Sequence, residues 1–364
     1  MSTDNIKPVY PAPGWVEVDA YNRAEAEGCA SLAIPDLIAF KPVSFERGGY
    51  PVRVTVEGEL LRYADHNFEP EVKNLFVPGA EFRPAAYRNR FSHDEKELFD
   101  RMRDLVVDLT RRRFGRPVRP ISNLLVQMAP FRIIDAIAAR LGQKPAIFEA
   151  GPGMGYFGAL LALSGYRYMS YDITQALCLW QNRLHAWIAG EEFGELITNN
   201  HPASLQRRVV QIPWWKFVHF RQGSPVRADI VYSNSNLGEM HPFALPQVLF
   251  IARQILQDSA LGLFMFIHHG SQPQQDESTI NNLIDQFGFQ RVFAKNFHGF
   301  ILKGRSLPPA LLELEQIETP DFNPSGRGGA LQAAEIMAVA PQEAPLDVVA
   351  CQLLFSWQPP FKQP

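Results

Sequence analysis

A glycine-rich turn follows a short apolar run in the segment IFEAGPGMGYFG, residues 147–158. Glycine has no side chain, so such a turn lets the backbone approach a ligand closely. The segment has two interpretations. One pattern, G-x-G-x-G, uses Gly151, Gly153 and Gly155, whereas the other, G-x-G-x-x-G, starts at Gly153 and ends at Gly158. Either would place free backbone N–H groups at a helix N-terminus, which favours an anion such as a pyrophosphate or a carboxylate.

Two acids accompany this turn and bear on its ligand. Asp172 ends the next apolar segment and can accept the ribose hydroxyls of either NAD or S-adenosylmethionine. Glu149, two residues before Gly151, separates the two ligands, since a carboxylate disfavours a neighbouring pyrophosphate and favours an ammonium. Pro152 also favours the first pattern, because the second would put a proline at the end of a central strand.

The elements that must position these residues alternate along residues 145–305. Short apolar segments predict strands, and amphipathic segments between them predict helices; the strand segments are 146–150, 166–173, 207–217, 228–241 and 260–270. Such alternation is typical of parallel strands with helices on both faces. The last segment, residues 289–304, holds two strands without a helix between them, so these must be antiparallel. We therefore expect an α/β, doubly wound (Rossmann-like), mostly parallel sheet with an antiparallel terminal strand.

The rest of the chain is expected to form three further parts around the 145–305 core. Residues 1–90 read as a loop-rich segment with a strand or hairpin in PVRVTVEGELLRY, residues 51–63. Residues 91–144 are expected to be a largely helical extension that covers the site. Residues 306–364 form an irregular tail rich in proline and glycine.

Residues 91–144 carry sequence patterns typical of helix starts and ends. Ser92 and Glu95 form the pattern of a capping box at the start of a helix, and Gly115 follows its end. A second helical stretch is interrupted by Pro130, where we expect a break, and stops at Gly142.

Composition narrows the class of protein. The net charge is −3, with 46% apolar and 20% charged residues, so a general nucleic-acid binder with its basic surplus is not expected. The cysteines Cys29, Cys178 and Cys351 follow no metal-ligand spacing and suit a reducing cytoplasm. No signal-peptide pattern and no apolar run of about 20 residues is present, so we expect a cytoplasmic chain without a membrane span. The oligomeric state is left open.

The order of these segments from about 145 to 304 resembles class I S-adenosylmethionine-dependent methyltransferases. The matching pieces are E-A-G-P-G-M-G (149–155), the acid of Y-D-I (171–173), the polar end of A-D-I-V-Y-S-N-S-N (228–236) and the final pair of strands. Within that superfamily, YDITQALCLWQNRLH and SNSNLGEMH are similar to segments of bacterial sugar O-methyltransferases.

The resemblance implies contacts with the cofactor S-adenosylmethionine. The residues concerned are Glu149 and the amides of Gly151, Gly153 and Gly155 at the methionine moiety, Asp172 at the ribose, Ile173, Gln211 and Ile212 at the adenine, and Asn234 near the methyl group. For the two isoleucines, a place in the core is equally open.

Methyl transfer from a sulfonium is an in-line displacement that depends mainly on alignment. The implied acceptor is a hydroxyl of a small molecule such as a sugar or nucleotide-sugar, and a general base would add about 10²- to 10⁴-fold to the rate. The preferred base is His241, followed by His268 and Glu239; His269 and His298 lie in neighbouring loops. Asp172, Glu239, His268 and His269 have side chains of the types that bind metals, but they show no tight ligand spacing, so no metal is predicted.

Two other functions stay open at this point. An NAD(P)-dependent oxidoreductase would use the G-x-G-x-x-G pattern of residues 153–158. A non-catalytic binding module would keep the fold and serve a partner.

Overall fold

The computed structural model of the chain describes residues 12–42, 52–64, 91–267, 269, 274–295 and 297–317. The chain divides into two compact units. The first unit contains the described residues up to Leu60 together with Asp135–Glu315. The second unit contains the described residues of Leu61–Ile134 and those from Gln316 onward. This division differs from the expected parts, because the early residues group with the sheet. That the extension 91–144 covers the site stays a prediction.

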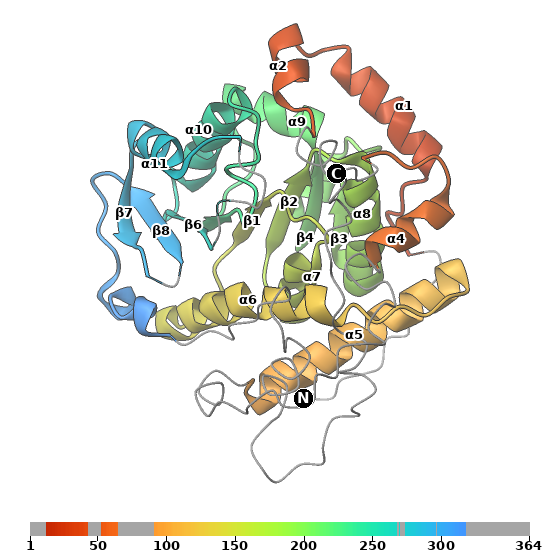
Figure 1. Ribbon diagram of the computed structural model, residues 1–364, viewed down its shortest axis with the longest axis horizontal. Coiled ribbons are helices and arrows are strands. Elements are labelled where there is room, and N and C mark those ends of the chain that lie inside the picture. Colours follow the sequence, from red (N-terminus) through yellow and green to blue (C-terminus); the bar gives the residue numbers. More distant parts are fainter. Residues whose placement is uncertain are drawn as a thin grey trace, which may run out of the picture. The chain divides into compact units, whose positions relative to one another are not determined.

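A sheet with strand order β3-β4-β2-β1-β5-β6-β8-β7 forms the centre of the first unit (Figure 1). Its strands are β1 (Ile147–Ala150), β2 (Tyr168–Asp172), β3 (Phe193–Glu195), β4 (Val209–Pro213), β5 (Ile230–Tyr232), β6 (Leu263–Phe266), β7 (Phe289–Phe293) and β8 (His298–Leu302). All neighbours from β3 to β6 are parallel, whereas β8 is antiparallel to both β6 and β7. The expected fold class, with its reversed strand, is confirmed. The short edge strand β3 was not foreseen from the sequence.

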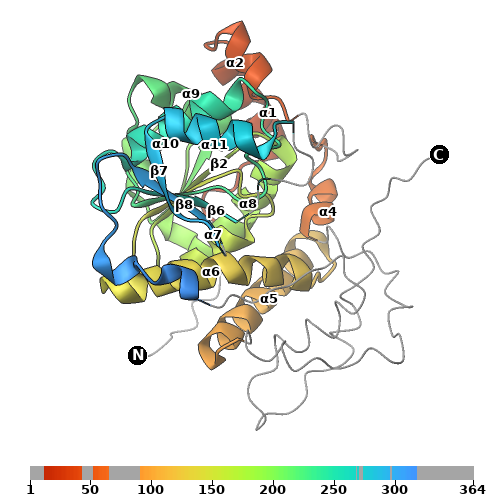
Figure 2. The same ribbon diagram turned by 60° about the vertical axis from the view of Figure 1, so that its left-hand side comes forward.

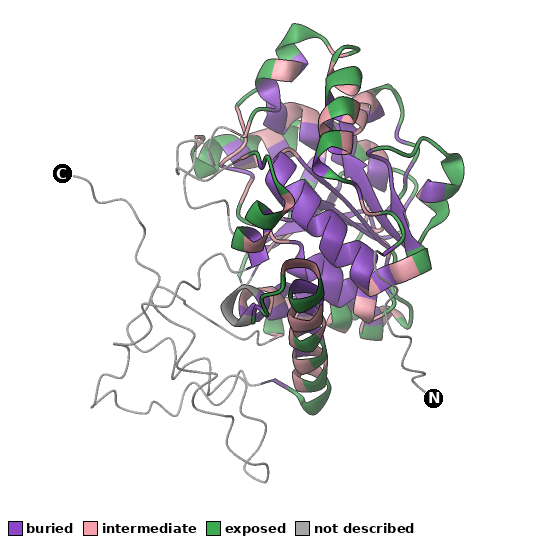
Figure 3. Ribbon diagram, turned by 90° about the vertical axis from the view of Figure 1, so that its right-hand side faces the viewer, coloured by how far each residue is buried: buried purple, intermediate pink, exposed green. Residues whose placement is uncertain are grey.

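The strand order changes direction at β1, which has β2 on one side and β5 on the other. In an open parallel sheet, the crevice at the carboxyl ends of such strands is the usual ligand site. Strands β1, β2, β4, β5 and β6 are buried along their whole length, as Figure 3 shows in purple. Burial on both faces explains why the sequence reads as apolar runs rather than as an alternation.

Helices cover both faces of the sheet, as expected. One face carries α7 (Tyr156–Leu163) and α8 (Gln175–Ala189), and the other carries α9 (Trp214–His219), α10 (Ala244–Leu256) and α11 (Glu277–Gln286). Figure 2 shows α10 and α11 on one side of the strands and α7 on the other. Tyr171 of β2 stacks on Phe217 of α9 with ring centroids 3.6 Å apart, whereas Gln211 of β4 donates to the Cys178 carbonyl of α8.

An N-terminal arm, defined here as the described residues 12–42 and 52–60, packs against α8 and α9. It contains α1 (Val18–Cys29), α2 (Ile34–Ala39) and the 3-10 turn η1 (Glu57–Leu60). The Gly14 carbonyl accepts from Asn182 at 3.0 Å, and Glu57 receives two hydrogen bonds from the buried Arg183 at 2.7 and 2.8 Å. Trp214 donates to Glu25 at 2.9 Å.

The strand expected within residues 51–63 is wrong for its described part. Residues 52–56 have no regular structure, and η1 and α4 (Leu61–Ala64) follow. The reason lies in the backbone partners. Val54 N–H donates to the Gln175 side chain at 2.8 Å, and the Val52 carbonyl accepts from Ala176 N–H at 3.2 Å. The start of α8 thus takes the hydrogen bonds that a neighbouring strand would need.

The second unit contains α4, α5 (His93–Phe114) and most of α6 (Ile121–Leu141). The expected capping box is confirmed: Ser92 accepts from Glu95 N–H at 3.2 Å, and Glu95 accepts from Ser92 N–H at 2.7 Å. Gly115 ends α5 with a φ of 68°. The break expected at Pro130 is wrong, since α6 continues through it. A proline removes one helix hydrogen bond, which packing of this largely apolar helix offsets.

The remaining short helices are 3-10 turns in the first unit and at its end. They are η4 (Gly190–Glu192), η5 (Pro202–Gln206), η6 (Phe220–Gln222), η7 (Pro309–Leu311) and η8 (Leu314–Gln316). Most of the expected tail, 306–364, lies outside the described residues. Within the described ranges, no helix is both long and apolar enough to cross a membrane.

Gly158 provides a test of how tightly α7 packs on the sheet. An added Cβ there would overlap the phenol ring of Tyr168 on β2. We expect Gly158→Ala to destabilise the protein by about 1–3 kcal/mol, because the core is already filled. Thermal unfolding measures this, with Gly58→Ala as control, since a Cβ at Gly58 meets open space. Equal melting temperatures for the two variants would contradict the packing.

Candidate functional site

The glycine turn between β1 and α7 has a backbone that requires glycine. Gly151, Gly153 and Gly155 have φ angles of 71°, 57° and 74°, in the left-handed region that other residues rarely adopt. Gly151 N–H extends the β-ladder by donating to the Tyr171 carbonyl at 3.0 Å. Gly155 N–H closes the turn on the Pro152 carbonyl at 2.9 Å. All three glycines of the G-x-G-x-G pattern therefore have a conformational role.

Gly158, the last glycine of the competing pattern, has a different role. It lies inside α7 and packs against Tyr168. Close helix–strand packing explains it without a ligand.

Glu149 points from β1 toward the face covered by α7 and is 3% exposed. Its carboxyl group accepts from the Tyr168 hydroxyl at 2.5 Å. Burial raises the pKa of Glu149 to about 8; the Tyr168 hydrogen bond opposes this rise and the charge of Asp172 adds to it. Without a ligand, the side chain is thus mostly protonated at neutral pH. A cation placed beside it would favour the ionised form.

Asp172 is the last residue of β2 and is also buried. One carboxylate oxygen accepts from Thr174 N–H at 2.8 Å and the other from the Gln181 side chain at 2.9 Å. Burial raises the pKa of Asp172 to about 6, although these hydrogen bonds lower it in part. The Gly153 backbone N–H and the Thr174 hydroxyl also donate to Asp172, so a further donor would have to share or displace one of these hydrogen bonds.

Gln181 of α8 connects Asp172 to the glycine turn. Its amide nitrogen donates both to Asp172 and to the Gly153 carbonyl, the latter at 2.6 Å. Two neighbours on α8 also contact the turn: Trp180 donates to the Met154 carbonyl, and a His185 ring nitrogen lies 3.0 Å from the Gly155 carbonyl. The sequence singled out none of these residues, because only the packing of α8 on the turn brings them there.

The loop after β5 folds back onto the end of β1. Asn236 donates to the carbonyls of Ala150 and Gly151 at 2.6 and 3.2 Å, and Ser233 donates to the Ala150 carbonyl at 3.2 Å. Ser233 also hydrogen bonds to Asn236. Ser235 between them has a φ of 56° and is, in the described part of the chain, the one non-glycine residue with a positive φ. Such strain is common in ligand-binding loops.

Asn236 contacts the glycine turn, and the expected place of Asn234 near the methyl group stays a prediction. An added Cβ at Gly151 would overlap the Asn236 amide, while the side chain of Asn234 is half-buried. The segment SNSN offers two asparagines two residues apart. Only the left-handed turn at Ser235 decides which of them reaches Gly151.

The residues expected at the adenine have different surroundings. Ile173 follows Asp172 and is half-buried. Gln211 is buried, with its nitrogen donating to the Cys178 carbonyl at 2.7 Å and its oxygen accepting from Asn182 at 3.1 Å. Ile212 is fully buried in the sheet. Of the three, Ile173 alone combines a place beside Asp172 with partial exposure.

The N-terminal arm borders the site at the carboxyl end of β4. Trp214 and Trp215 directly follow this strand; Trp214 donates to Glu25, and Trp215 meets Tyr21 edge-on at 5.3 Å. Tyr21 is fully buried, and burial raises its pKa well above the ordinary value, with nearby charges including Asp172 adding to the shift. The arm thus reaches the surroundings of Asp172, which the sequence did not reveal.

Two of the expected catalytic residues, His241 and Glu239, lie in the loop between β5 and α10. His241 accepts from Phe243 N–H through Nδ1 at 3.2 Å. The proton of the neutral ring is therefore on Nε2, which makes this ring a hydrogen-bond donor at its other end. Glu239 is half-buried in the same loop, and its N–H donates to the Asn236 carbonyl at 3.0 Å. His268 lies outside the described residues.

Comparisons with known proteins give distant structural likenesses only. No family model and no curated protein matches the chain. Similar solved structures include a TehB-like SAM-dependent methyltransferase from Corynebacterium glutamicum, with 16% identity, 58% of this chain and 98% of that chain covered, and a TM-score of 0.34. Another is 1,6-didemethyltoxoflavin-N1-methyltransferase from Burkholderia thailandensis, with 16% identity, 66% and 95% covered, and a TM-score of 0.34. The glycopeptide N-methyltransferase MtfA complexed with sinefungin shows 11% identity, 47% and 87% covered, and a TM-score of 0.32. Likenesses of this size assign no function.

The raised pKa of Glu149 predicts how stability depends on pH. Between about 4.5 and 8 the folded protein holds a proton that the unfolded chain has lost, so stability falls as pH rises. We expect Glu149→Gln, which can still accept from Tyr168, to remove this loss. Its melting temperature should exceed that of the unsubstituted protein at pH 8.5 without ligand, and the difference should shrink toward pH 5.

Thermal unfolding across this pH range measures the effect. Glu191→Gln, at an exposed position, is the control and should follow the unsubstituted protein. A Glu149→Gln variant with the same pH dependence as the unsubstituted protein would show that Glu149 is ionised in the empty site.

Proposed function

We propose that this chain is an S-adenosylmethionine-dependent methyltransferase of class I. The observation that carries the proposal is the position of two buried carboxyl groups, Glu149 and Asp172, on either side of the left-handed glycine turn. The amides of the turn suit the carboxylate of the methionine moiety. Glu149 suits its ammonium, and Asp172 suits the ribose hydroxyls.

Charge favours this cofactor over a dinucleotide. Glu149 is buried next to the turn, so a pyrophosphate there would meet either its negative charge or a carboxyl group held neutral by burial. An ammonium would instead lower the pKa of Glu149, so that the carboxyl group loses its proton to solvent and forms a charge-assisted pair with the cation. Cofactor binding should therefore release a proton at neutral pH.

We further propose that the acceptor is a hydroxyl of a small metabolite, with a sugar or nucleotide-sugar as the leading class. The sugar class rests on the resemblance of residues 171–185 and 233–241. In the reaction, the acceptor oxygen attacks the methyl carbon in line, the carbon–sulfur bond breaks, and its electron pair stays on sulfur in S-adenosylhomocysteine. His241, the base preferred from the sequence, accepts from Phe243 N–H through Nδ1, so we assign the base to Glu239 instead. Glu239 would accept the hydroxyl proton, and Nε2–H of His241 would orient the acceptor.

Calorimetry on the full chain tests the cofactor. We expect S-adenosylhomocysteine to bind and NADH not to bind. Asp172→Asn should weaken binding by about 10- to 100-fold, because it weakens hydrogen bonds to a charged acceptor. Asp285→Asn, at an exposed position in a surface ion pair, should bind as the unsubstituted protein does.

Two results would contradict the proposal. Binding of NADH without S-adenosylhomocysteine would favour the oxidoreductase. Cofactor binding without turnover on a panel of hydroxyl and amine acceptors would favour the binding module.

A further inference from the structure

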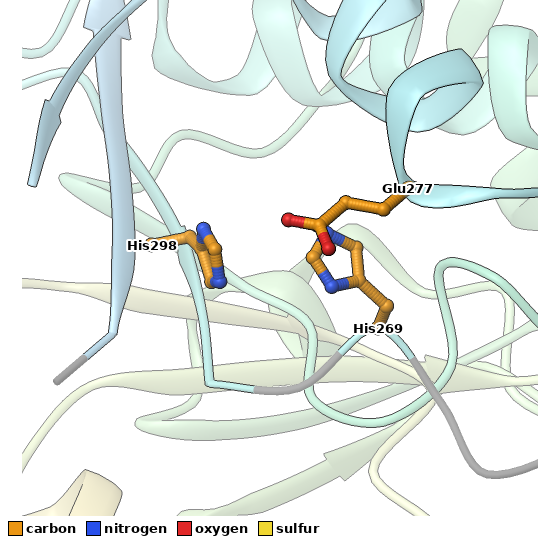
Figure 4. Close-up of side chains that lie close together, drawn as sticks. All are labelled: His269, Glu277 and His298. Atoms are coloured by element: carbon orange, nitrogen blue, oxygen red, sulfur yellow. The ribbon is translucent and has the colours of Figure 1, made fainter. Parts of the chain in front are cut away.

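Three side chains with metal-binding chemistry converge at the carboxyl edge of β6. His269 follows this strand, Glu277 is the first residue of α11, and His298 begins β8. One ligand atom of each lies within 4.8 Å of the others, and Figure 4 shows the carboxylate and the two imidazoles facing a common space. The three residues come from the end of β6 and the starts of α11 and β8, so no short sequence motif contains them.

The two imidazoles are held by a buried aromatic ring. Phe266, the last residue of β6, pairs in register with His298, and their rings stack with centroids 4.7 Å apart. The His269 ring meets Phe266 edge-on at 4.8 Å and lies 4.9 Å from the His298 ring. Phe266 is fully buried, so it fixes both rings against the end of the sheet.

Glu277 is positioned by the start of its helix. Asp276 caps α11 by accepting from Thr279 N–H at 2.7 Å, which fixes the backbone beside Glu277. The Glu277 side chain is 60% exposed, and its oxygen lies 3.8 Å from His269 Nε2. Ligand atoms around a tetrahedral zinc ion are roughly 3.3 Å apart. The 3.8 Å separation of the Glu277 and His269 atoms is close to the one that a tetrahedral ion requires.

The ligand set indicates which ion would bind. Two imidazole nitrogens and one carboxylate suit Zn²⁺ and related divalent transition metals, whereas Mg²⁺ and Ca²⁺ prefer oxygen ligands alone. Three protein ligands also leave a coordination position for water or substrate, as in catalytic zinc sites.

We propose that His269, Glu277 and His298 bind a divalent transition metal, with Zn²⁺ as the favoured ion and one coordination position left open. The site adjoins the loop that carries Glu239 and His241, because Gly238 N–H donates to the His269 carbonyl at 2.6 Å. The open position would take the acceptor hydroxyl and polarise it for attack. This role, unlike metal binding itself, rests on the proposed methyl transfer.

Isothermal titration calorimetry of the chelator-treated full chain with ZnCl₂ tests the site. We expect one zinc ion per chain. His269→Ala and His298→Ala should each weaken binding by more than about 100-fold, beyond the 10- to 100-fold typical of an outer-shell change. His201→Ala, at an exposed histidine elsewhere, should leave the affinity unchanged.

Cobalt gives a signature that a structural role would not produce. Co²⁺ added to the unsubstituted protein should show visible ligand-field bands, and these should vanish in Glu277→Gln, whose fold is checked by circular dichroism. Zinc affinity unchanged in both histidine variants, or equally reduced in His201→Ala, would overturn the site.

The site and the proposed function fail separately. Zinc binding that survives in a protein unable to bind S-adenosylhomocysteine would discard the methyltransferase and keep the metal site. If the protein binds S-adenosylhomocysteine but the histidine substitutions leave zinc affinity unchanged, the metal site is discarded and the methyltransferase is kept.

Discussion

The layout of the site depends on the burial of two carboxyl groups at the carboxyl ends of adjacent strands. A buried carboxyl group must find hydrogen-bond donors, since water is excluded. Tyr168 meets this need for Glu149, and Thr174 and Gln181 meet it for Asp172. These donors come from β2 and from the start and middle of α8. Because Gln181 also donates to the Gly153 carbonyl, the same helix fixes the position of the glycine turn. A ligand entering the turn finds both acids already oriented.

The need of buried polar groups for partners also explains why the N-terminal arm packs against the sheet unit, on helix α8. Helix α8 buries a guanidinium, that of Arg183, together with the polar side chains of Asn182 and Gln175. An unpaired charge of this kind would destabilise the fold strongly. Glu57 of the arm pairs with Arg183 in a two-point interaction, and Arg183 also donates to Asn182 at 2.8 Å. Without the arm, the buried Arg183, Asn182 and Gln175 of α8 would lose these hydrogen-bond partners.

The sequence predicted what depends on local pattern. The glycine turn, the acids beside it and the reversed strand β8 follow from spacing and from the absence of a helix between the last two strands. It missed what depends on contacts between distant residues. The strand β3 has three residues, which is too short for a recognisable pattern. Residues 52–56 have the alternating pattern of a strand, but the side chain of Gln175 forms hydrogen bonds with the backbone of Val54. The contacts of Asn236 and Gln181 with the glycine turn depend on the folded positions of the β5–α10 loop and of α8, which no local sequence pattern indicates.

The docking of the arm also constrains the order in which the protein can form. Gly14 bonds to a residue 168 positions later, and Glu25 to one 189 positions later. During synthesis the arm leaves the ribosome long before α8 and α9 exist, so it must wait without its partners. Contacts of such long range slow folding, because loop closure precedes any gain from the contact. The native contacts of the arm, including those near Asp172, can therefore form only after α8 and α9 have been synthesised.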